Sequence, residues 1–458
     1  MTGHLQVAAN PSHPAELGNG WPNLALFLIV GYLGLGKPFA YLGLPWVSLY
    51  IGEMVLLTFL FFGPRTTEGD WLSVVWRVQK LRPLRRLLLL SLFYGGFLAL
   101  RGVLQGYPAL TAARDTAFDY YPLFLFVGIW VGLRDSKFLC RVVRVLSLWA
   151  GCYGLAYILF LNRVPWTMPG TESRVPVFLG PYGASTVALL GLLAIESGPK
   201  QAWHLILLNL FVLLGVQVRA EWVGFAAGIL VFAWLTRKLK QLALAASALV
   251  VLLGLMYATG LDLQTPTGRG ESVGSRISAA YLVARAIAPV SRDLGEELAS
   301  TEDVSFAAGT AEWRLVWWAN IWGEVHAGLS STLLGFGYGY PVGDLNPDIQ
   351  PGTFMQTPHN DFLYALVFSG WLGVILFALF QLEIGRLLWR GYRITGRPFG
   401  FICWAAFLTM SLFEDFFEAP FAAIPSYLLL GAAIAPLLLA SSEGPRKATP
   451  ESWAALPT

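Results

Sequence analysis

Residues 361–385, DFLYALVFSGWLGVILFALFQLEIG, form a long apolar run that opens with an aspartate. Roughly 20 apolar residues are enough for a helix to cross the hydrocarbon core of a bilayer. The chain as a whole has the same character, because its 458 residues are 56% hydrophobic and only 13% charged. A soluble domain cannot bury that much apolar surface. The expected fold class is therefore an all-α polytopic membrane protein.

Apolar runs of this kind predict about twelve transmembrane helices, of which the first is short enough to be re-entrant. No basic region followed by a cleavable apolar segment opens the chain, so no signal peptide is expected. Cys140, Cys152 and Cys403 lie in or beside apolar runs, which argues against a disulfide framework or a metal cluster. The expected spans lie near residues 22–36, 44–62, 87–105, 117–133, 142–161, 176–195, 202–218, 220–236, 241–259, 361–385, 399–414 and 420–440.

Lysine and arginine predict the orientation, because they accumulate on the cytoplasmic side of membrane proteins. When the loops alternate between the two sides, twenty of the 31 basic residues fall on one side and eleven on the other. Both termini are then cytoplasmic. The expected organisation is helices 1–9 in residues 1–259, a periplasmic loop domain in 260–358, helices 10–12 in 359–440 and a cytoplasmic tail in 441–458.

The eleven basic residues on the outer side are one lysine, Lys37, and ten arginines. A guanidinium matches phosphate oxygens with two parallel hydrogen bonds, which an ammonium cannot do. The alternative is that these arginines only reach toward the membrane interface. Arg219 stands out, because a charge on so short a turn between two apolar runs is costly and tends to be functional. The ten are Arg101, Arg114, Arg163, Arg174, Arg219, Arg269, Arg276, Arg285, Arg292 and Arg314.

The loop of residues 260–358 contains five arginines and eleven acids, a net charge of −6. Anion binding there requires particular arginines to be gathered at one point. SRISAAYLVARAIAPVSRDLGEEL (275–298) predicts an interfacial helix broken near Pro289. TAEWRLVWWANIWGEVHAGL (310–329) predicts a helix with Thr310 as N-cap and Trp317 and Trp318 on the face of Arg314. That face is either a cation–π packed surface or an anion site with a sugar-stacking wall.

Two further features of this region suggest a site. In LLGFGYGYP (333–341) the glycines allow a backbone to approach a ligand closely. His359 is one of only five histidines, and an imidazole can accept a proton from a hydroxyl near neutral pH. On a continuous helix, His359 would share one face with Gly370 and Gly373, against which a neighbouring helix can pack closely. The alternative is a histidine that caps the helix or bonds a loop carbonyl.

His359-Asn360, nine residues, Gly370, two residues and Gly373 form an H-N-x9-G-x-x-G pattern. This pattern resembles the signature of bacterial O-antigen ligases, whose superfamily also holds O-antigen polymerases and protein O-oligosaccharyltransferases. The similarity covers most of the chain, including the long periplasmic loop before the signature helix. Arg114, Arg219 and Arg314 resemble arginines of the family pattern, although QVRAEW lacks the Ser or Thr usually found before the arginine at 219.

The resemblance implies a GT-C-type glycosyltransferase of the bacterial inner membrane, acting in lipopolysaccharide biosynthesis. Such an enzyme transfers a glycan from undecaprenyl diphosphate to a sugar hydroxyl of lipid A-core in the periplasmic leaflet, with inversion and without a metal or other cofactor. His359 would be the general base, and Arg219 and Arg314 would hold the diphosphate. Expected substrate-binding residues are Arg114, Arg276, Arg285, Asn360, Trp317 and Tyr338, and expected structural residues are Gly335, Gly337, Gly370 and Gly373.

The expected partners are the lipid-linked donor, the lipid A-core acceptor and membrane lipids, with no nucleic acid. The alternatives are a polymerase or a protein O-oligosaccharyltransferase of the same superfamily and, outside it, a glycolipid transporter or flippase. Transporters often have internal repeats and midplane charges, whereas no clear repeat is visible here. The outer side is also expected to lack paired carboxylates, which fits a site where arginines replace a metal ion.

Overall fold

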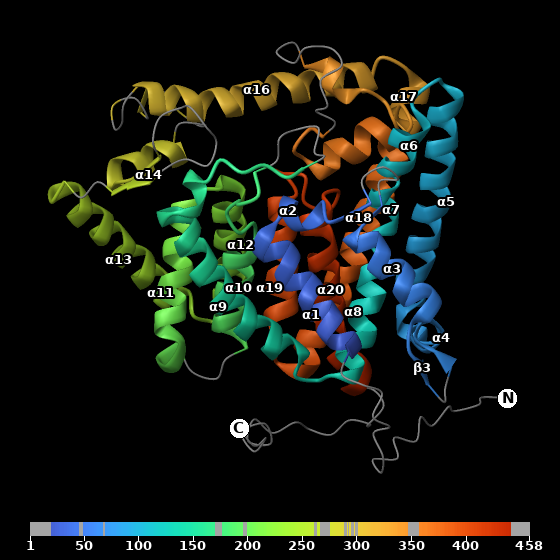
Figure 1. Cartoon of the computed structure of the whole chain (residues 1–458), viewed down its shortest axis with the longest axis horizontal. Coiled ribbons are helices and arrows are strands. Elements are labelled where there is room, and N and C mark those ends of the chain that lie inside the picture. The colour runs from blue at the N-terminus through green and yellow to red at the C-terminus, as the bar shows by residue number, and fades with distance from the viewer. Residues whose placement is uncertain are drawn as a thin grey trace.

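The apolar runs fold into helices, because a helix satisfies its own backbone hydrogen bonds where no water is available. In the computed structural model these helices stand side by side in a bundle, and one long helix lies across its upper end (Figure 1). We call this upper end the outer side. The structure describes residues 20–44, 49–66, 69–169, 176–195, 199–260, 263–265, 275–287, 291, 293–294, 297, 301–346 and 357–440.

The bundle contains helices from both halves of the chain. The first half contributes α1 (Gly20–Leu35), α2 (Lys37–Ala40), α3 (Ile51–Phe62), α4 (Trp71–Trp76), η2 (Gln79–Leu81), α5 (Arg82–Leu104), α6 (Ala109–Asp115), α7 (Ala117–Tyr120), α8 (Leu123–Arg134), α9 (Phe138–Leu159), η3 (Leu161–Arg163), α10 (Ala184–Ala194), α11 (Pro199–Val216), α12 (Arg219–Leu235) and α13 (Leu239–Ala258). The second half contributes α14 (Ala279–Ile287), α16 (Thr301–Val325), α17 (Leu329–Leu334), η4 (Val342–Leu345), α18 (Asp361–Thr395), α19 (Phe399–Met410) and α20 (Pro420–Ala440).

Three short antiparallel hairpins depart from the all-helical expectation. They pair β1 (Gly43–Leu44) with β2 (Leu49–Tyr50), β3 (Arg65–Thr66) with β4 (Gly69–Asp70), and β5 (Leu263–Thr265) with β6 (Ser275–Ile277). Each lies in a connection between helices, so the protein is a polytopic helical membrane protein with minor strands.

Every one of the twelve predicted spans contains a helix. Within the described ranges, five helical segments are long and apolar enough to cross a membrane: Gln79–Leu104, Ala109–Arg134, Phe138–Leu159, Asp361–Thr395 and Pro420–Ala440. Shorter apolar helices include α1, α3, α10 and α19. Twelve crossings therefore remain a prediction, as do the domain boundaries, and the tail 441–458 lies outside the described residues.

Small residues bring α8 and α20 into close contact at the centre of the bundle. A Cβ at Gly128 would lie 2.2 Å from the carbonyl oxygen of Leu428, and one at Gly431 would lie 2.0 Å from that of Leu125. Helices in lipid gain stability from such close packing, because the hydrophobic effect does not drive them together.

The outer helices agree only partly with the sequence. α14 covers only part of the predicted interfacial helix, because Ser275–Ile277 form β6 instead, and the predicted break near Pro289 lies outside the described residues. α16 begins at Thr301, so the prediction that Thr310 caps it is wrong, because the helix continues upstream through that residue. Figure 1 shows α16 lying across the top of the bundle.

α18, the helix of the signature, is not continuous. It begins at Asp361 and breaks at Gly370, whose φ of 62° and ψ of −168° are outside the helical region. His359 precedes the helix, so the prediction that it shares one helical face with Gly370 and Gly373 is wrong. The break exposes backbone carbonyls, which the glycine run then uses.

The glycine run approaches the backbone of α18. The amide nitrogens of Phe336 and Gly337 donate to the carbonyl oxygens of Val367 and Phe368, both over 2.9 Å. A Cβ at Gly335 would lie 2.4 Å from the carbonyl carbon of Phe368, so this close approach requires glycine. These backbone contacts therefore hold the glycine run, and α17 before it, against α18.

Arg101 stabilises the end of α17 in the same region. Its Nη1 donates to the carbonyl oxygens of Leu334 and Gly335, at 2.9 and 2.7 Å. These carbonyls lie at the end of α17, where helical partners are missing. Arg101 thus fastens the outer end of α5 to α17.

We expect Gly370→Ala to destabilise the protein by at least about 1–3 kcal/mol, because only glycine adopts this backbone conformation freely. The new Cβ would also lie 2.4 Å from the carbonyl carbon of Leu333. Thermal unfolding in detergent measures the effect. Gly96→Ala is the control, since a Cβ at Gly96 meets nothing within 4 Å. Equal unfolding temperatures for both variants would contradict this account of the break.

Candidate active site

His359 lies directly before α18, held in an unusual backbone conformation. Its φ is 52°, a left-handed value that non-glycine residues seldom adopt and that often marks functional sites. The next residue, Asn360, fixes this geometry because its Oδ1 accepts hydrogen bonds from the amide nitrogens of Phe362 and Leu363, both at 3.0 Å. Its Nδ2 donates to the carbonyl oxygen of Leu412 at 2.9 Å. Both ends of the Asn360 amide are therefore occupied.

Asp361 joins the start of α18 to residues 411–419, SLFEDFFEA, which we call the acidic loop. The loop connects α19 to α20. The Asp361 amide nitrogen donates to the carbonyl oxygen of Ser411 at 2.9 Å. Its fully buried carboxylate accepts from the amide nitrogens of Phe416 and Phe417, at 3.2 and 2.7 Å. The acidic loop is thus held against the residues that contain His359.

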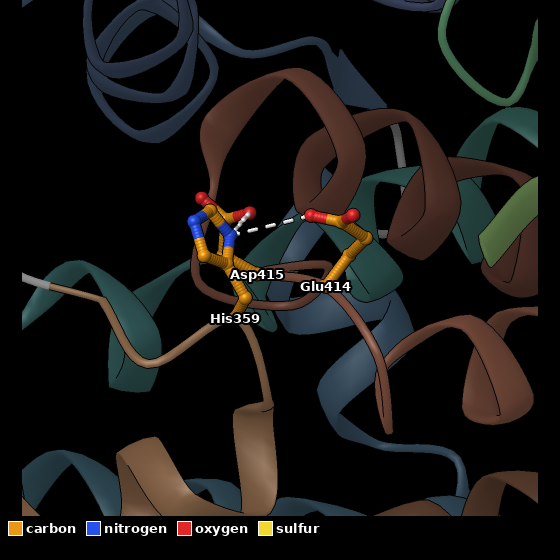
Figure 2. A group of neighbouring side chains, drawn as sticks. All are labelled: His359, Glu414 and Asp415. Carbon is orange, nitrogen blue, oxygen red and sulfur yellow. Dashed lines mark hydrogen bonds and ion pairs between the residues drawn. The ribbon is translucent and has the colours of Figure 1, made fainter. Parts of the chain in front are cut away.

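The His359 ring faces two carboxylates of the acidic loop. Nδ1 lies 3.3 Å from Oδ1 of Asp415 and 3.3 Å from Oε2 of Glu414. Figure 2 shows both interactions ending on the same ring nitrogen. Among the described residues no hydrogen bond reaches Nε2. When Nδ1 carries a hydrogen toward the acids, Nε2 is the nitrogen that can accept a proton.

This cluster changes the titration of its members. Burial by itself lowers the pKa of His359, but the hydrogen bonds and charges of Asp415 and Glu414 raise it to about 9. Burial opposes ionisation of both acids, yet their contacts with His359 hold the pKa of each carboxyl below its ordinary value. At neutral pH the cluster is an imidazolium between two carboxylates. This pKa is higher than the near-neutral value that the sequence suggested.

Arg314 reaches the same cluster from α16. Its Nη1 donates to the carbonyl oxygen of Phe413 at 2.7 Å and its Nη2 to Oε1 of Glu414 at 3.1 Å. Nearby, Nε1 of Trp318 donates to the carbonyl oxygen of Pro358, just before His359, at 2.7 Å. The structure therefore brings Arg314 and His359 together through Glu414, although 45 positions separate them in the sequence.

Two other predicted arginines border this region. Arg219 is the first residue of α12, and Glu221 in the same turn interacts electrostatically with Glu414. Arg114 lies in the last turn of α6 and interacts electrostatically with Glu418 of the acidic loop. The turns that contain these arginines therefore lie around the acidic loop.

Other predicted site residues lie elsewhere or are buried. Trp317 is fully buried, and its Nε1 donates to the carbonyl oxygen of Val342 at 3.0 Å. Tyr338 is also buried, with its hydroxyl donating to Oδ2 of Asp119 at 2.6 Å. Neither ring has an open face for a sugar in this structure. Arg276 lies in β6 and Arg285 in α14, and their side chains lie outside the described residues.

The acidic loop is what the sequence reasoning missed. The expectation of no paired carboxylates on the outer side is wrong, since Glu414 and Asp415 both face His359. A signal was present, because FEDFFEAP (413–420) places Glu414 at the end of one predicted span and Asp415 and Glu418 between that span and the next. Ionisable residues so close to a membrane are costly and tend to be functional.

The three side chains of Figure 2 also have the donor types of a metal site. One ligand atom from each of His359, Glu414 and Asp415 lies within 4.8 Å of the others, and a divalent ion accepts such nitrogen and oxygen ligands. A metal ion would have to displace the proton that the raised His359 pKa describes. A proton on His359 and a metal ion would therefore compete for the same position between the ring and the two acids.

Fold and site define a helical membrane protein with an ionised histidine–acid cluster at its outer end. Residues 204–378 match a family model described as O-antigen ligase. This segment contains Arg219, Arg314 and His359, and it belongs to the O-antigen ligase superfamily, which confirms the recognition from the His-Asn signature. The family is one of glycosyltransferase-type enzymes of lipopolysaccharide biosynthesis that act on lipid-linked glycans. No curated protein matches the chain.

Asp415→Asn should lower the pKa of His359 by about 1–3, because it removes a negative partner at hydrogen-bonding distance from the ring. NMR of selectively labelled histidine can follow this titration, since the chain has only five histidines. His326, which contacts Trp322 and Trp371, provides a reference resonance that the substitution should leave unchanged. An unaltered His359 titration would mean that Asp415 does not hold the charge of the ring.

Proposed function

We propose that this protein is an O-antigen ligase. It transfers a glycan from undecaprenyl diphosphate to a sugar hydroxyl of lipid A-core, with inversion at the anomeric carbon and without a metal ion. One observation supports this reaction above all: Asp415 and Glu414 bind Nδ1 of His359, beside Arg314, while Nε2 has no hydrogen bond among the described residues. That arrangement can remove a proton from a hydroxyl next to a leaving anion.

The proposed location is the bacterial inner membrane, with the site on the periplasmic side and both termini cytoplasmic. The excess of basic residues in the opposite loops supports this orientation. So does the fold, because α1 begins and α20 ends at the end of the bundle opposite α16 (Figure 1). A site on the outer side is accessible to two lipid-anchored substrates in the same leaflet.

In the proposed reaction, Nε2 of neutral His359 accepts the proton of the acceptor hydroxyl as its oxygen bonds to the anomeric carbon. The bond from that carbon to the phosphate oxygen breaks, and the electron pair leaves with undecaprenyl diphosphate. Asp415 and Glu414 stabilise the imidazolium that forms, as a carboxylate does beside the histidine of a hydrolase triad. The high pKa of His359 is the measure of this stabilisation.

Arginines would stabilise the leaving diphosphate. A guanidinium has five N–H donors, and the described contacts of Arg314 use two of them. The others can bind phosphate oxygens while Glu414 holds the group in place. Arg219, in the first turn of α12, would bind the same diphosphate. Preorganised positive charge of this kind can replace the divalent ion that many glycosyl and phosphoryl transfers use.

The remaining predicted contacts take lesser parts in this proposal. Arg276 and Arg285 are proposed donor contacts, as the sequence suggested. Asn360 is reassigned from substrate binding to positioning His359, since both ends of its amide are bonded. Trp317 and Tyr338 are reassigned to packing because they are buried.

Reconstitution with a defined lipid-linked donor separates the proposed ligase from its alternatives. We expect undecaprenyl diphosphate to be released, in the presence of EDTA, only when lipid A-core is supplied. Growth of the glycan on a second lipid-linked chain would identify a polymerase, and transfer to a peptide an O-oligosaccharyltransferase. Movement of intact donor across the bilayer without release would identify a transporter. Loss of activity in EDTA that Mg²⁺ or Mn²⁺ restores would assign a metal to the histidine–acid cluster.

His359→Gln should lower the transfer rate by about 10²–10⁴-fold, because glutamine cannot take the proton. Only the neutral ring is a base, and with a pKa of about 9 roughly 1% of rings are neutral at pH 7. The rate of the native enzyme should therefore rise with pH and level off above about 9, and Asp415→Asn should move that plateau to lower pH.

His326→Gln is the matched control, an exposed outer histidine whose described partners are aromatic or backbone groups. It should keep native activity. A folded His359→Gln protein that ligates at the native rate would rule out general-base catalysis by this residue.

A further inference from the structure

A small cavity lies inside the bundle, where α5 packs against α7 and α18 (Figure 1). It measures about 20 Å³, which is room for one water molecule or one small ion. Neither His359 nor the acidic loop contributes to its lining. Its polar lining consists of Ser91 and Tyr94 of α5, Asp119 of α7, Ser369 of α18 and Tyr427 of α20.

The cavity contains one carboxylate, that of Asp119. Asp119 lies within Ala109–Arg134, a helical segment long and apolar enough to cross a membrane. Its Oδ2 accepts a hydrogen bond from the hydroxyl of Tyr338 at 2.6 Å. In the described part of the chain no lysine, arginine or histidine lines the cavity. An ionised carboxylate in such a place is costly unless a positive charge accompanies it, and this lining supplies none.

The break in α18 places the end of a helix at the same cavity. The first half of α18 runs from Asp361 to the break at Gly370, and Ser369 just before the break lines the cavity. The C-terminal end of a helix has a partial negative charge. The hydroxyl of Tyr94 donates to the carbonyl oxygen of Ser369 at 2.6 Å, so these two oxygens lie together. Broken helices in membrane transporters coordinate Na⁺ with carbonyl oxygens of this kind.

Two glycines leave space for the oxygen atoms of the cavity. A Cβ at Gly95 of α5 would lie 2.1 Å from Oδ2 of Asp119. A Cβ at Gly373, the last glycine of the signature, would lie 1.7 Å from Oγ of Ser369. A side chain at either position would therefore displace a polar group of α7 or α18 from its place beside the cavity.

We infer that this cavity binds one small monovalent cation, Na⁺. Hard cations prefer carboxylate and carbonyl oxygens, which Asp119 and Ser369 provide, and tyrosine hydroxyls can accept as well as donate. One carboxylate balances one positive charge, whereas divalent sites usually gather several acids. Asp119 and Tyr94 are only half-buried, so the cavity is not sealed. The inference goes beyond the proposed function and does not depend on it.

Thermal unfolding of the purified full-length protein in detergent tests the site. The unfolding temperature is compared in NaCl and in choline chloride at equal ionic strength, because choline is too large for the cavity. At about ten times its Kd, Na⁺ should raise the unfolding temperature by roughly 2–4 °C, since a ligand that binds only the folded state stabilises it. Equilibrium binding of radioactive Na⁺ should show one saturable site per chain.

Substitutions locate the site. Asp119→Asn removes the charge but keeps an oxygen that can accept from Tyr338, so it should abolish the rise in Na⁺. Asp135→Asn is the matched control, because Asp135 pairs with Arg141 and does not line the cavity, and it should respond as the native protein does. Tyr427→Phe removes one hydroxyl from the lining and should weaken the binding of radioactive Na⁺ about fivefold. This measurement decides the matter if Asp119→Asn does not fold.

Two results would overturn the inference. If native protein unfolded at the same temperature in both salts and bound no radioactive Na⁺, a proton rather than a cation would neutralise Asp119. If Asp119→Asn or Tyr427→Phe bound Na⁺ as the native protein does, the ion would lie elsewhere. None of these measurements requires glycan transfer, so their outcome is separate from that of the ligase proposal.

Discussion

The buried carboxylate of Asp361 holds the site together. It accepts hydrogen bonds from two successive amide nitrogens, those of Phe416 and Phe417, at the far end of the acidic loop. A carboxylate without exposed surface is stable only when it is hydrogen-bonded, and buried amide nitrogens equally need an acceptor. Oδ2 of Asp361 meets both needs, whereas its buried Oδ1 has no hydrogen-bond partner among the described residues. The two hydrogen bonds also fix the loop so that Glu414 and Asp415 face His359, the position that decides how the histidine titrates.

The break in α18 positions the part of the site that contains Arg314. Because the helix is interrupted at Gly370, carbonyls that would bond within it are available to the glycine run that follows α17. Arg101 holds the same segment from α5. These contacts hold α17 and the glycine run against the bundle. As a result, α16, which precedes them, lies where Arg314 contacts Glu414. A signature glycine thus acts on the site through the backbone rather than through a helical face.

The charged residues around the acidic loop are arranged so that acids lie near bases. Each acid is placed near a base from a different part of the chain, so that no ionised group is left alone in a medium of low dielectric constant. The pairing is uneven, however. Glu414 and Asp415 are engaged by His359 and Arg314, whereas burial and the neighbouring acids Asp415 and Asp115 raise the pKa of Glu418 to about 8, so that Glu418 favours its protonated form.

The sequence alone determined the class of the molecule, because apolar length and composition decide which chains need a bilayer and where helices form. It also determined the recognition of the family, since His359, Asn360, Gly370 and Gly373 are close together in the chain and their spacing can be read directly. It identified Arg219 as unusual, because a charge next to apolar runs is costly wherever the runs pack, and Arg314 by the tryptophans that share its helical face.

Only the tertiary structure decided what surrounds His359. The acidic loop lies more than fifty positions further along, and the facing of Glu414 and Asp415 depends on the contacts of Asp361, which no local pattern encodes. The same holds for Trp317 and Tyr338, which were expected to bind substrate but are buried, with their polar atoms bonded to Val342 and Asp119. Periodicity describes one helix at a time, whereas a pKa depends on the charges that folding brings from other segments.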